Sequence, residues 1–139
     1  MEAKEFLRQI KKLDKLIENK MAEIQKWKEI AMNTSPSMTG ERVQSTHNPH
    51  RIADAIGRYI DLEKEIVQEI DNLIDVKKNV IGVIEQLNTT EYDVLHKIYV
   101  QGFTFDEVAV ACNHTTSWAT TVHGRALKHV QNILDRKKD

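Results

Sequence analysis

The chain has 139 residues, of which 40% are hydrophobic and 29% charged, and its formal net charge is −1. This balance predicts one or two small domains and excludes a polybasic protein, so any nucleic-acid binding must come from a local patch. No apolar run approaches the length of a membrane span, and the first residues alternate charged with apolar side chains, so we expect no secretory signal there. The single cysteine excludes a disulfide within the chain and favours a reducing cytoplasm.

Helical periodicity dominates the first part of the chain. From Phe6 to Ala31, apolar residues recur every three or four positions among Lys, Glu, Gln and Arg, which predicts one amphipathic helix over 3–32. The following residues, 33–48, are polar, hold most of the helix breakers and show no periodicity. They predict a long surface loop.

A second long helix is predicted over 49–87, with Asn48 as its N-cap and Pro49 in its first turn. Two amphipathic helices joined by a loop predict an antiparallel, coiled-coil-like helical hairpin, which we place in a domain over 1–87. The continuous stripes also suit pairing with a second chain, so a homodimer through the hairpin is one possible assembly.

Residues 88–139 predict a second domain of three shorter helices, which makes the expected fold all-α. Thr104 and Glu107 fit a capping box at the start of one helix, which runs to about Cys112. Thr115 is suited to cap the next helix after a short turn. Two helices joined by a turn of three or four residues are typical of the helix-turn-helix.

The C-terminal third resembles region 4 of the sigma-70 family. The matching residues are Leu87, Tyr92-x-Val94-Leu95, Tyr99-Val100-Gln101-Gly102-Phe103-Thr104, Glu107-Val108-Ala109, Thr115 and Arg125-Ala126-Leu127. With the long helices in front, the chain is similar to small sigma-factor-like proteins of phages and integrated elements of Gram-positive bacteria, which are described as phage transcriptional regulators. The resemblance implies a bacterial host cytoplasm, duplex DNA as partner, and RNA polymerase as a possible second partner.

The turn departs from the family pattern. It carries Cys112-Asn113-His114 where Leu-Gly-Ile or Leu-Gly-Val is usual. Asn113 is expected to replace glycine because asparagine tolerates a left-handed backbone, and Cys112 is expected to replace leucine as a small hydrophobe.

The last helix is predicted to have an inward and an outward face. Its apolar residues form the inward stripe, and hydroxyl residues near its start face outward, where they can reach base edges or phosphates. Because no Arg or Lys lies among these hydroxyl residues, we expect binding to be dominated by phosphates and steep in salt. The predicted DNA-binding residues are Thr115, Thr116, Ser117, Thr120, Thr121, Arg125 and Lys128.

Metal binding and catalysis are the less favoured interpretations. Possible ligands occur at His47, His50, Cys112, His114, His123 and His129, but no CxxC or HxxxH spacing joins them. His123 is expected to pack as a neutral imidazole. No nucleophile–base pattern or phosphate-binding glycine loop is present, so we expect neither an enzyme nor a cofactor.

Two alternative functions keep the same helices. A phage DNA-packaging protein of the small terminase-subunit kind also joins a helix-turn-helix to oligomerising helices. A helical adaptor that binds RNA polymerase rather than DNA is the other alternative.

Overall fold

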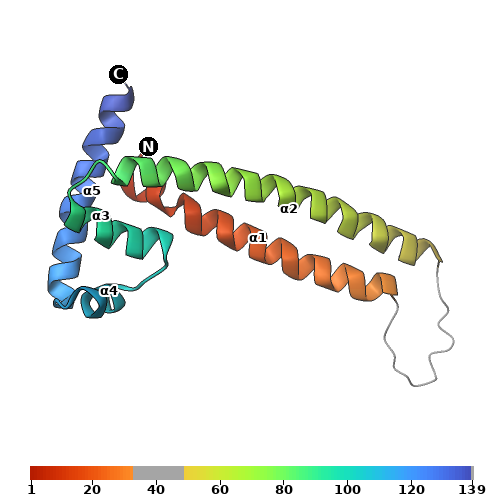
Figure 1. Ribbon diagram of the computed structural model, residues 1–139. Helices are drawn as coiled ribbons and strands as arrows, with labels where there is room; N and C mark the ends of the chain where they lie inside the picture. Colours follow the sequence, from red (N-terminus) through yellow and green to blue (C-terminus); the bar gives the residue numbers. More distant parts are fainter. Residues whose placement is uncertain (33–48, 139) are drawn as a thin grey trace. The chain divides into compact units, whose positions relative to one another are not determined.

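The computed structural model describes residues 1–32 and 49–138 (Figure 1). Throughout these ranges the regular structure is helical and contains no strand, which confirms the all-α prediction. The elements are α1 (Ala3–Met32), α2 (Pro49–Ile84), α3 (Thr89–Leu95), the π-helical turn η2 (His96–Val100), α4 (Phe105–Cys112) and α5 (Thr116–Lys138). None of these described helices has both the length and the apolarity to cross a membrane. The predicted loop over 33–48 lies outside the described residues, and so does Asn48, the predicted N-cap of the second long helix.

The end of α2 corrects the predicted limit at Leu87. The helix ends at Ile84, and the amides of Gln86 and Leu87 donate to the carbonyls three residues back, at 3.1 and 3.0 Å. Such bonds tighten the last turn and stop the α-helix. Asn88 then has an extended backbone, and its side chain accepts a hydrogen bond of 2.8 Å from the amide of Glu91, which starts α3.

The chain packs as two units, whose limits differ from the predicted division at residue 87. One unit consists of Met1–Asp14 and Asn72–Asp139, and we call it the terminal unit because it holds both ends of the chain. The other consists of Lys15–Asp71, and we call it the middle unit. The helices α1 and α2 therefore each contribute to both units.

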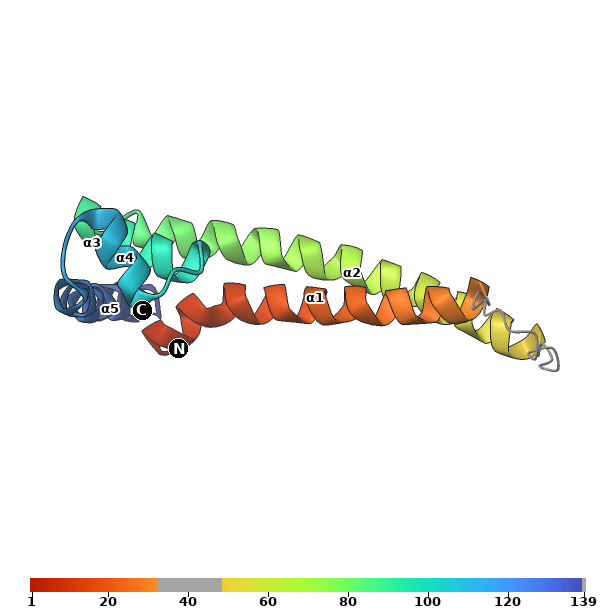
Figure 2. The same ribbon diagram turned by 90° about the horizontal axis from the view of Figure 1, so that it is seen from below.

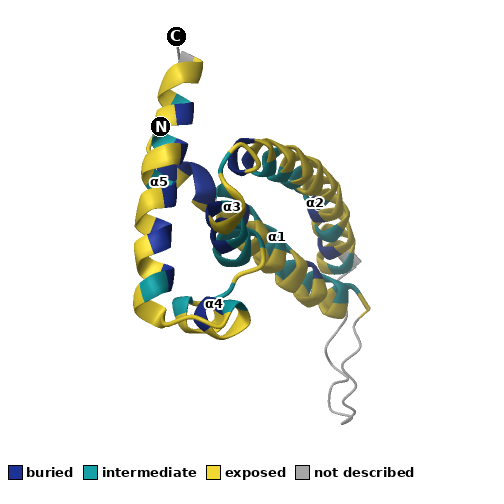
Figure 3. Ribbon diagram, turned by 60° about the vertical axis from the view of Figure 1, so that its left-hand side comes forward, coloured by how far each residue is buried: buried dark blue, intermediate teal, exposed yellow. Residues whose placement is uncertain are grey.

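The main core of the terminal unit combines residues from both ends of the chain. The amide of Ala3 donates to the side-chain oxygen of Gln131 at 2.8 Å, so the first turn of α1 is bonded to α5. Figure 3 shows the buried side of α5. The buried residues of this core are Ala3, Phe6, Leu7, Ile10, Val80, Val83, Ile84, Leu95, Ala126, Val130 and Ile133.

A second, smaller cluster in the terminal unit holds α4 in place. Its buried residues are Val94 of α3, Val108 of α4, and Ala119 and Val122 of α5. Partly buried aromatic side chains of Phe103, Phe105 and Trp118 pack around these four residues. Because α4 has only eight residues, this packing rather than helix propensity determines its position.

The middle unit is connected by ion pairs between α1 and α2, which lie side by side in both views (Figure 2). Lys20, the first of these residues in α1, pairs with the two that come last in α2, whereas the later α1 residues pair with earlier α2 residues, so the helices run in opposite directions here. The pairs are Lys20–Glu69 at 3.5 Å, Lys20–Glu65 at 3.2 Å, Glu23–Arg58 at 3.4 Å and Lys28–Glu63 at 3.7 Å.

Candidate nucleic-acid interface

The start of α4 has the predicted capping box. The amide of Thr104 donates to Glu107 Oε1 at 2.8 Å, and the amide of Glu107 donates to Thr104 Oγ1 at 3.1 Å. Both residues therefore satisfy backbone groups that an isolated helix end leaves without partners. A sequence pattern of four residues was sufficient to predict this helix start.

The end of α4 depends on Asn113. Its backbone is left-handed, with φ 57° and ψ 42°, and it is the only described residue other than glycine with a positive φ. The amide of His114 donates to the carbonyl of Ala109 at 2.9 Å, and that of Asn113 to the carbonyl of Val110 at 3.2 Å, as in a Schellman motif. The predicted left-handed backbone at Asn113 is confirmed.

The start of α5 is bonded both to the turn and to α4. Thr115 Oγ1 accepts from the amide of Trp118 at 3.0 Å, which confirms Thr115 as the cap. Thr116 Oγ1 donates to Asp106 Oδ1 at 2.7 Å, which links the first turns of the two helices. The His114 ring stacks on Trp118 with centroids 3.9 Å apart and planes 10° from parallel. These contacts hold α4, the turn and α5 as one rigid corner.

The helix α5 has one buried and one exposed side, as its sequence predicts. Ala119, Val122, Ala126, Val130 and Ile133 are buried, and Leu127 is half-buried. The predicted DNA-binding residues Thr115, Thr116, Ser117, Thr120, Thr121, Arg125 and Lys128 are all exposed. We call these seven residues the α5 surface.

Hydrogen bonds within the protein orient the hydroxyl groups of the α5 surface. Thr120 Oγ1 and Thr121 Oγ1 both donate to the carbonyl of Ser117, at 3.0 and 2.9 Å. With its one proton used in this way, each hydroxyl still has an oxygen lone pair available to accept a hydrogen bond. The two threonines are therefore predisposed to accept hydrogen bonds from a ligand rather than to donate them.

The charges on this side of the unit are unevenly placed. Arg125 and Lys128 are exposed along the middle of α5, whereas the carboxylate of Asp106 is bonded to Thr116 at its start. A carboxylate near a helix N-terminus is stabilised by the helix dipole, and it competes there with an external anion. The positive charges of the α5 surface thus lie roughly two and a half to three and a half turns beyond the helix start.

On the buried side of α5, His123 contacts Tyr99, a partner that the sequence did not predict. His123 is 8% exposed, its Nε2 lies 2.7 Å from Tyr99 Oη, and the ring of Phe105 meets it edge-on with centroids 5.0 Å apart. Burial, together with the positive charges of Lys4 and Arg8, lowers the pKa of His123 below its ordinary value. The neutral imidazole predicted at this position agrees with that direction.

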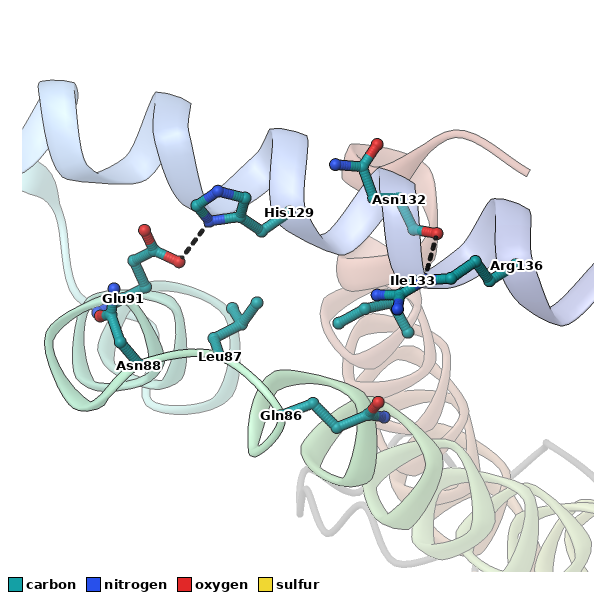
Figure 4. A pocket seen from close by; sticks show the side chains of 8 residues that line it. All are labelled: Gln86, Leu87, Asn88, Glu91, His129, Asn132, Ile133 and Arg136. Carbon is teal, nitrogen blue, oxygen red and sulfur yellow. Dashed lines mark hydrogen bonds and ion pairs between the residues drawn. The ribbon is translucent and has the colours of Figure 1, made fainter.

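A polar pocket of about 270 Å³ lies in the same unit, between the end of α2, the start of α3 and the second half of α5 (Figure 4). The carboxylate of Glu91 is buried, and its Oε1 lies 2.7 Å from Nδ1 of His129. Arg136 Nε donates to the carbonyl of Asn132 at 3.4 Å. Sequence reasoning missed Glu91, because no local pattern distinguishes a helix-start glutamate that becomes buried.

The described residues contain no group of side chains that could hold a metal ion. No three His, Cys, Asp or Glu side chains converge within residues 1–32 and 49–138, and His47 lies outside these ranges. Cys112 Sγ donates to Asp93 Oδ2 at 3.6 Å. Burial and this carboxylate raise the pKa of the Cys112 thiol, which disfavours the thiolate that a metal ligand or a nucleophile requires.

Comparisons with protein-family models, with curated proteins and with solved structures gave no match.

Proposed function

We propose that the protein is a DNA-binding transcriptional regulator in which α4, the turn and α5 act as a helix-turn-helix. The observation that carries the proposal is the α5 surface. Seven residues selected from the sequence as DNA contacts are all exposed, while the apolar residues of the same helix are buried or half-buried. An α-helix exposed along one side has the dimensions to enter the major groove of duplex DNA.

The chemistry of the α5 surface suggests which base groups it contacts. Thr120 and Thr121 use their hydroxyl protons within the helix and keep lone pairs for a ligand. In the major groove, the amino groups of cytosine and adenine are the hydrogen-bond donors that match such acceptors. Thr120 and Thr121 would then favour cytosine or adenine edges, and their methyl groups would favour the methyl group of thymine.

Affinity in this proposal comes mainly from phosphate contacts. Arg125 and Lys128 are exposed and carry the positive charge of the α5 surface. The negative charge of Asp106 at the start of α5 opposes a phosphate bound at that end. We therefore expect weak and strongly salt-dependent binding by a single chain.

The arrangement of the whole chain is the second part of the proposal. The long helices α1 and α2 would form a coiled-coil-like hairpin that presents the helix-turn-helix. The sequence resemblance to sigma region 4 supports a phage or integrated element as the source and RNA polymerase as a second partner.

Binding to duplex DNA with randomised sequence, followed by selection at two salt concentrations, tests the proposal. We compare the wild type with a double variant, Thr120→Val and Arg125→Ala, which removes one proposed base contact and one phosphate contact. The double variant should bind at least about tenfold more weakly, and its plot of log affinity against log salt should be shallower by about one unit.

The matched control is the double variant Thr90→Val and Arg58→Ala. It makes the same changes in composition and charge at exposed positions on α3 and α2. It should bind DNA like the wild type, and circular dichroism should show that both variants remain folded. A folded Thr120→Val, Arg125→Ala protein that binds like the wild type would refute the proposal, as would a wild type that binds no DNA even at low salt.

A further inference from the structure

The middle unit leaves more large apolar side chains exposed than it buries. Among its described residues, the buried apolar ones are Ile24, Ala55 and Leu62. Eight large hydrophobic side chains are exposed, namely Leu16, Met21, Ile30, Met32, Ile56, Ile60, Val67 and Ile70. Two helices packed along one line can bury only one stripe each, so the remaining apolar surface has no cover among the described residues of the unit.

Four of the exposed residues follow a second line along α2, which we call the outer stripe. It consists of Ile56, Ile60, Val67 and Ile70, with Glu63 between them. The steps of four, three, four and three residues repeat every seven, as in one seam of a coiled coil. The buried pair Ala55 and Leu62 is also seven residues apart and marks a different side of the same helix. Figure 3 shows the exposed side of α2.

One edge of α1 extends the outer stripe into a two-helix surface. Lys28 Nζ lies 3.7 Å from Glu63 Oε2, so Lys28 lies at the edge of α1 that borders the stripe. Met21 precedes Lys28 by seven residues and therefore shares its side of α1. The side chain of Met21 is exposed. The surface is thus apolar along α2, with Met21 beside it and one internally matched ion pair.

We infer that the outer stripe of α2 and the adjacent edge of α1 form the interface through which two copies of this chain pair. The inference does not depend on DNA binding. Seven-residue spacing fits another helix, and β-branched residues at both alternating positions of such a seam favour assemblies of more than two helices, which two copies of a two-helix unit provide. Because Glu63 already has Lys28 as its partner, the surface presents little net charge and does not suit a nucleic acid.

The size of the surface is consistent with a dimer interface. Two adjacent helices, each about 10 Å wide, present a side roughly 20 Å across. The α1 part of the middle unit, Lys15–Met32, extends for roughly 27 Å at the α-helical rise per residue. The resulting face of roughly 500 Å² in projection approaches the ~800 Å² of accessible surface that each partner of a standard complex buries.

Sedimentation equilibrium of the full chain across micromolar concentrations, without DNA, tests the inference. The wild type should fit a monomer–dimer equilibrium. The double variant Ile60→Lys and Val67→Lys places two charges in the proposed interface, and its dimer dissociation constant should rise at least about a hundredfold. The milder variant Ile60→Ala and Val67→Ala should raise it about tenfold without adding charge.

The matched control is the double variant Leu16→Lys and Ile30→Lys. Leu16 and Ile30 are 39% and 40% exposed, close to the 41% of Ile60. Both residues lie seven positions from Glu23, which pairs with Arg58 rather than with the outer stripe. This control adds the same charge to the same unit on another side and should dimerise like the wild type.

Circular dichroism should show equal helix content for all four proteins in their monomeric form. The alanine variant keeps the test valid if the lysine variant fails to fold. A wild type that remains monomeric, or that forms a ring or another assembly larger than a dimer, overturns the inference. Equal weakening of the dimer by the outer-stripe lysines and by the control lysines also overturns it.

Discussion

The two units of this chain bury their apolar residues to very different extents. In the terminal unit sixteen apolar residues are buried and three large ones are exposed, whereas the described part of the middle unit buries three and exposes eight. Helical pieces from both ends of the chain meet in the terminal unit, so each helix is covered on its apolar side. The described residues of the middle unit belong to α1 and α2, which cover one another along one line. The difference shows how the number of packed helices, rather than composition, determines whether a core is complete.

From this contrast we propose different tasks for the two units. The terminal unit holds the α5 surface on a closed core and a rigid corner of hydrogen bonds around Asn113 and Thr115. Such a unit is suited to present fixed side chains to a partner. The middle unit has surplus apolar surface and is suited to association. Three experiments on stability test the contrast itself.

The largest effect is expected from Leu7→Ala compared with Leu16→Ala. Leu7 of the terminal unit has no exposed surface, and its truncation should lower the free energy of unfolding by about 2–5 kcal/mol. Leu16 of the middle unit is 39% exposed, and the same change should cost less than about 1 kcal/mol. Urea unfolding followed by circular dichroism measures both values. Similar losses for the two variants would show that the contrast in burial does not reflect stability.

An intermediate effect is expected from His123. Burial lowers the pKa of this imidazole, with smaller contributions from Lys4 and Arg8, so the unfolded chain binds its proton more readily than the folded chain does. The stability associated with the neutral form is present above the unfolded pKa of about 6.5 and is lost as the pH falls towards the lower folded pKa. This proton can contribute a slope of at most about 1.4 kcal/mol per pH unit.

Replacement of His123 by Gln tests this slope. Glutamine keeps a polar group near Tyr99 but does not titrate. Unfolding free energies at several pH values between 7 and 5 should fall less steeply in His123→Gln than in the wild type. Identical slopes in the two proteins would show that His123 makes no contribution to the acid sensitivity of the terminal unit.

The smallest effect is expected from a comparison of two polar pairs by double-mutant cycles. Glu91 and His129 lie 2.7 Å apart in the terminal unit, and the Glu91 side chain is only 3% exposed, so we expect a coupling of about 1 kcal/mol. Lys28 and Glu63 lie 3.7 Å apart in the middle unit, and both are about half exposed, so we expect about 0.3 kcal/mol.

Alanine is the replacement in each cycle, and urea unfolding gives the four free energies. High salt should reduce the Lys28–Glu63 coupling towards zero because the pair is open to solvent. A coupling for the exposed pair that equals or exceeds that of Glu91 and His129 would contradict the assignment of a closed core to the terminal unit alone.

Sequence reasoning succeeded where a few neighbouring residues determine the result. Thr104 and Glu107 contain the donors and acceptors of a capping box, and Asn113 has the side chain that best tolerates a left-handed backbone after glycine. The buried and exposed sides of α5 follow from helical periodicity alone. The limits of α1 were also predicted correctly, whereas α2 ends three residues before the predicted Leu87.

Reasoning from the sequence failed where residues distant in the chain meet. The first fourteen residues looked like the start of a uniform amphipathic helix, yet Ala3 and Leu7 belong to the core of the terminal unit. The partners of His123 and His129, which are Tyr99 and Glu91, lie 24 and 38 residues away in the sequence. Nothing in the local pattern indicates such pairs, because they depend on how the helices pack.

The sequence by itself therefore determined the helices, their caps and the two sides of α5, since these depend on interactions within a few residues. Only the tertiary structure decided which apolar stripes are covered. On α2 one line of apolar residues faces α1 and a second line, from Ile56 to Ile70, remains exposed. Periodicity shows both lines as apolar, but burial depends on a neighbouring helix, and a neighbour is a property of the fold.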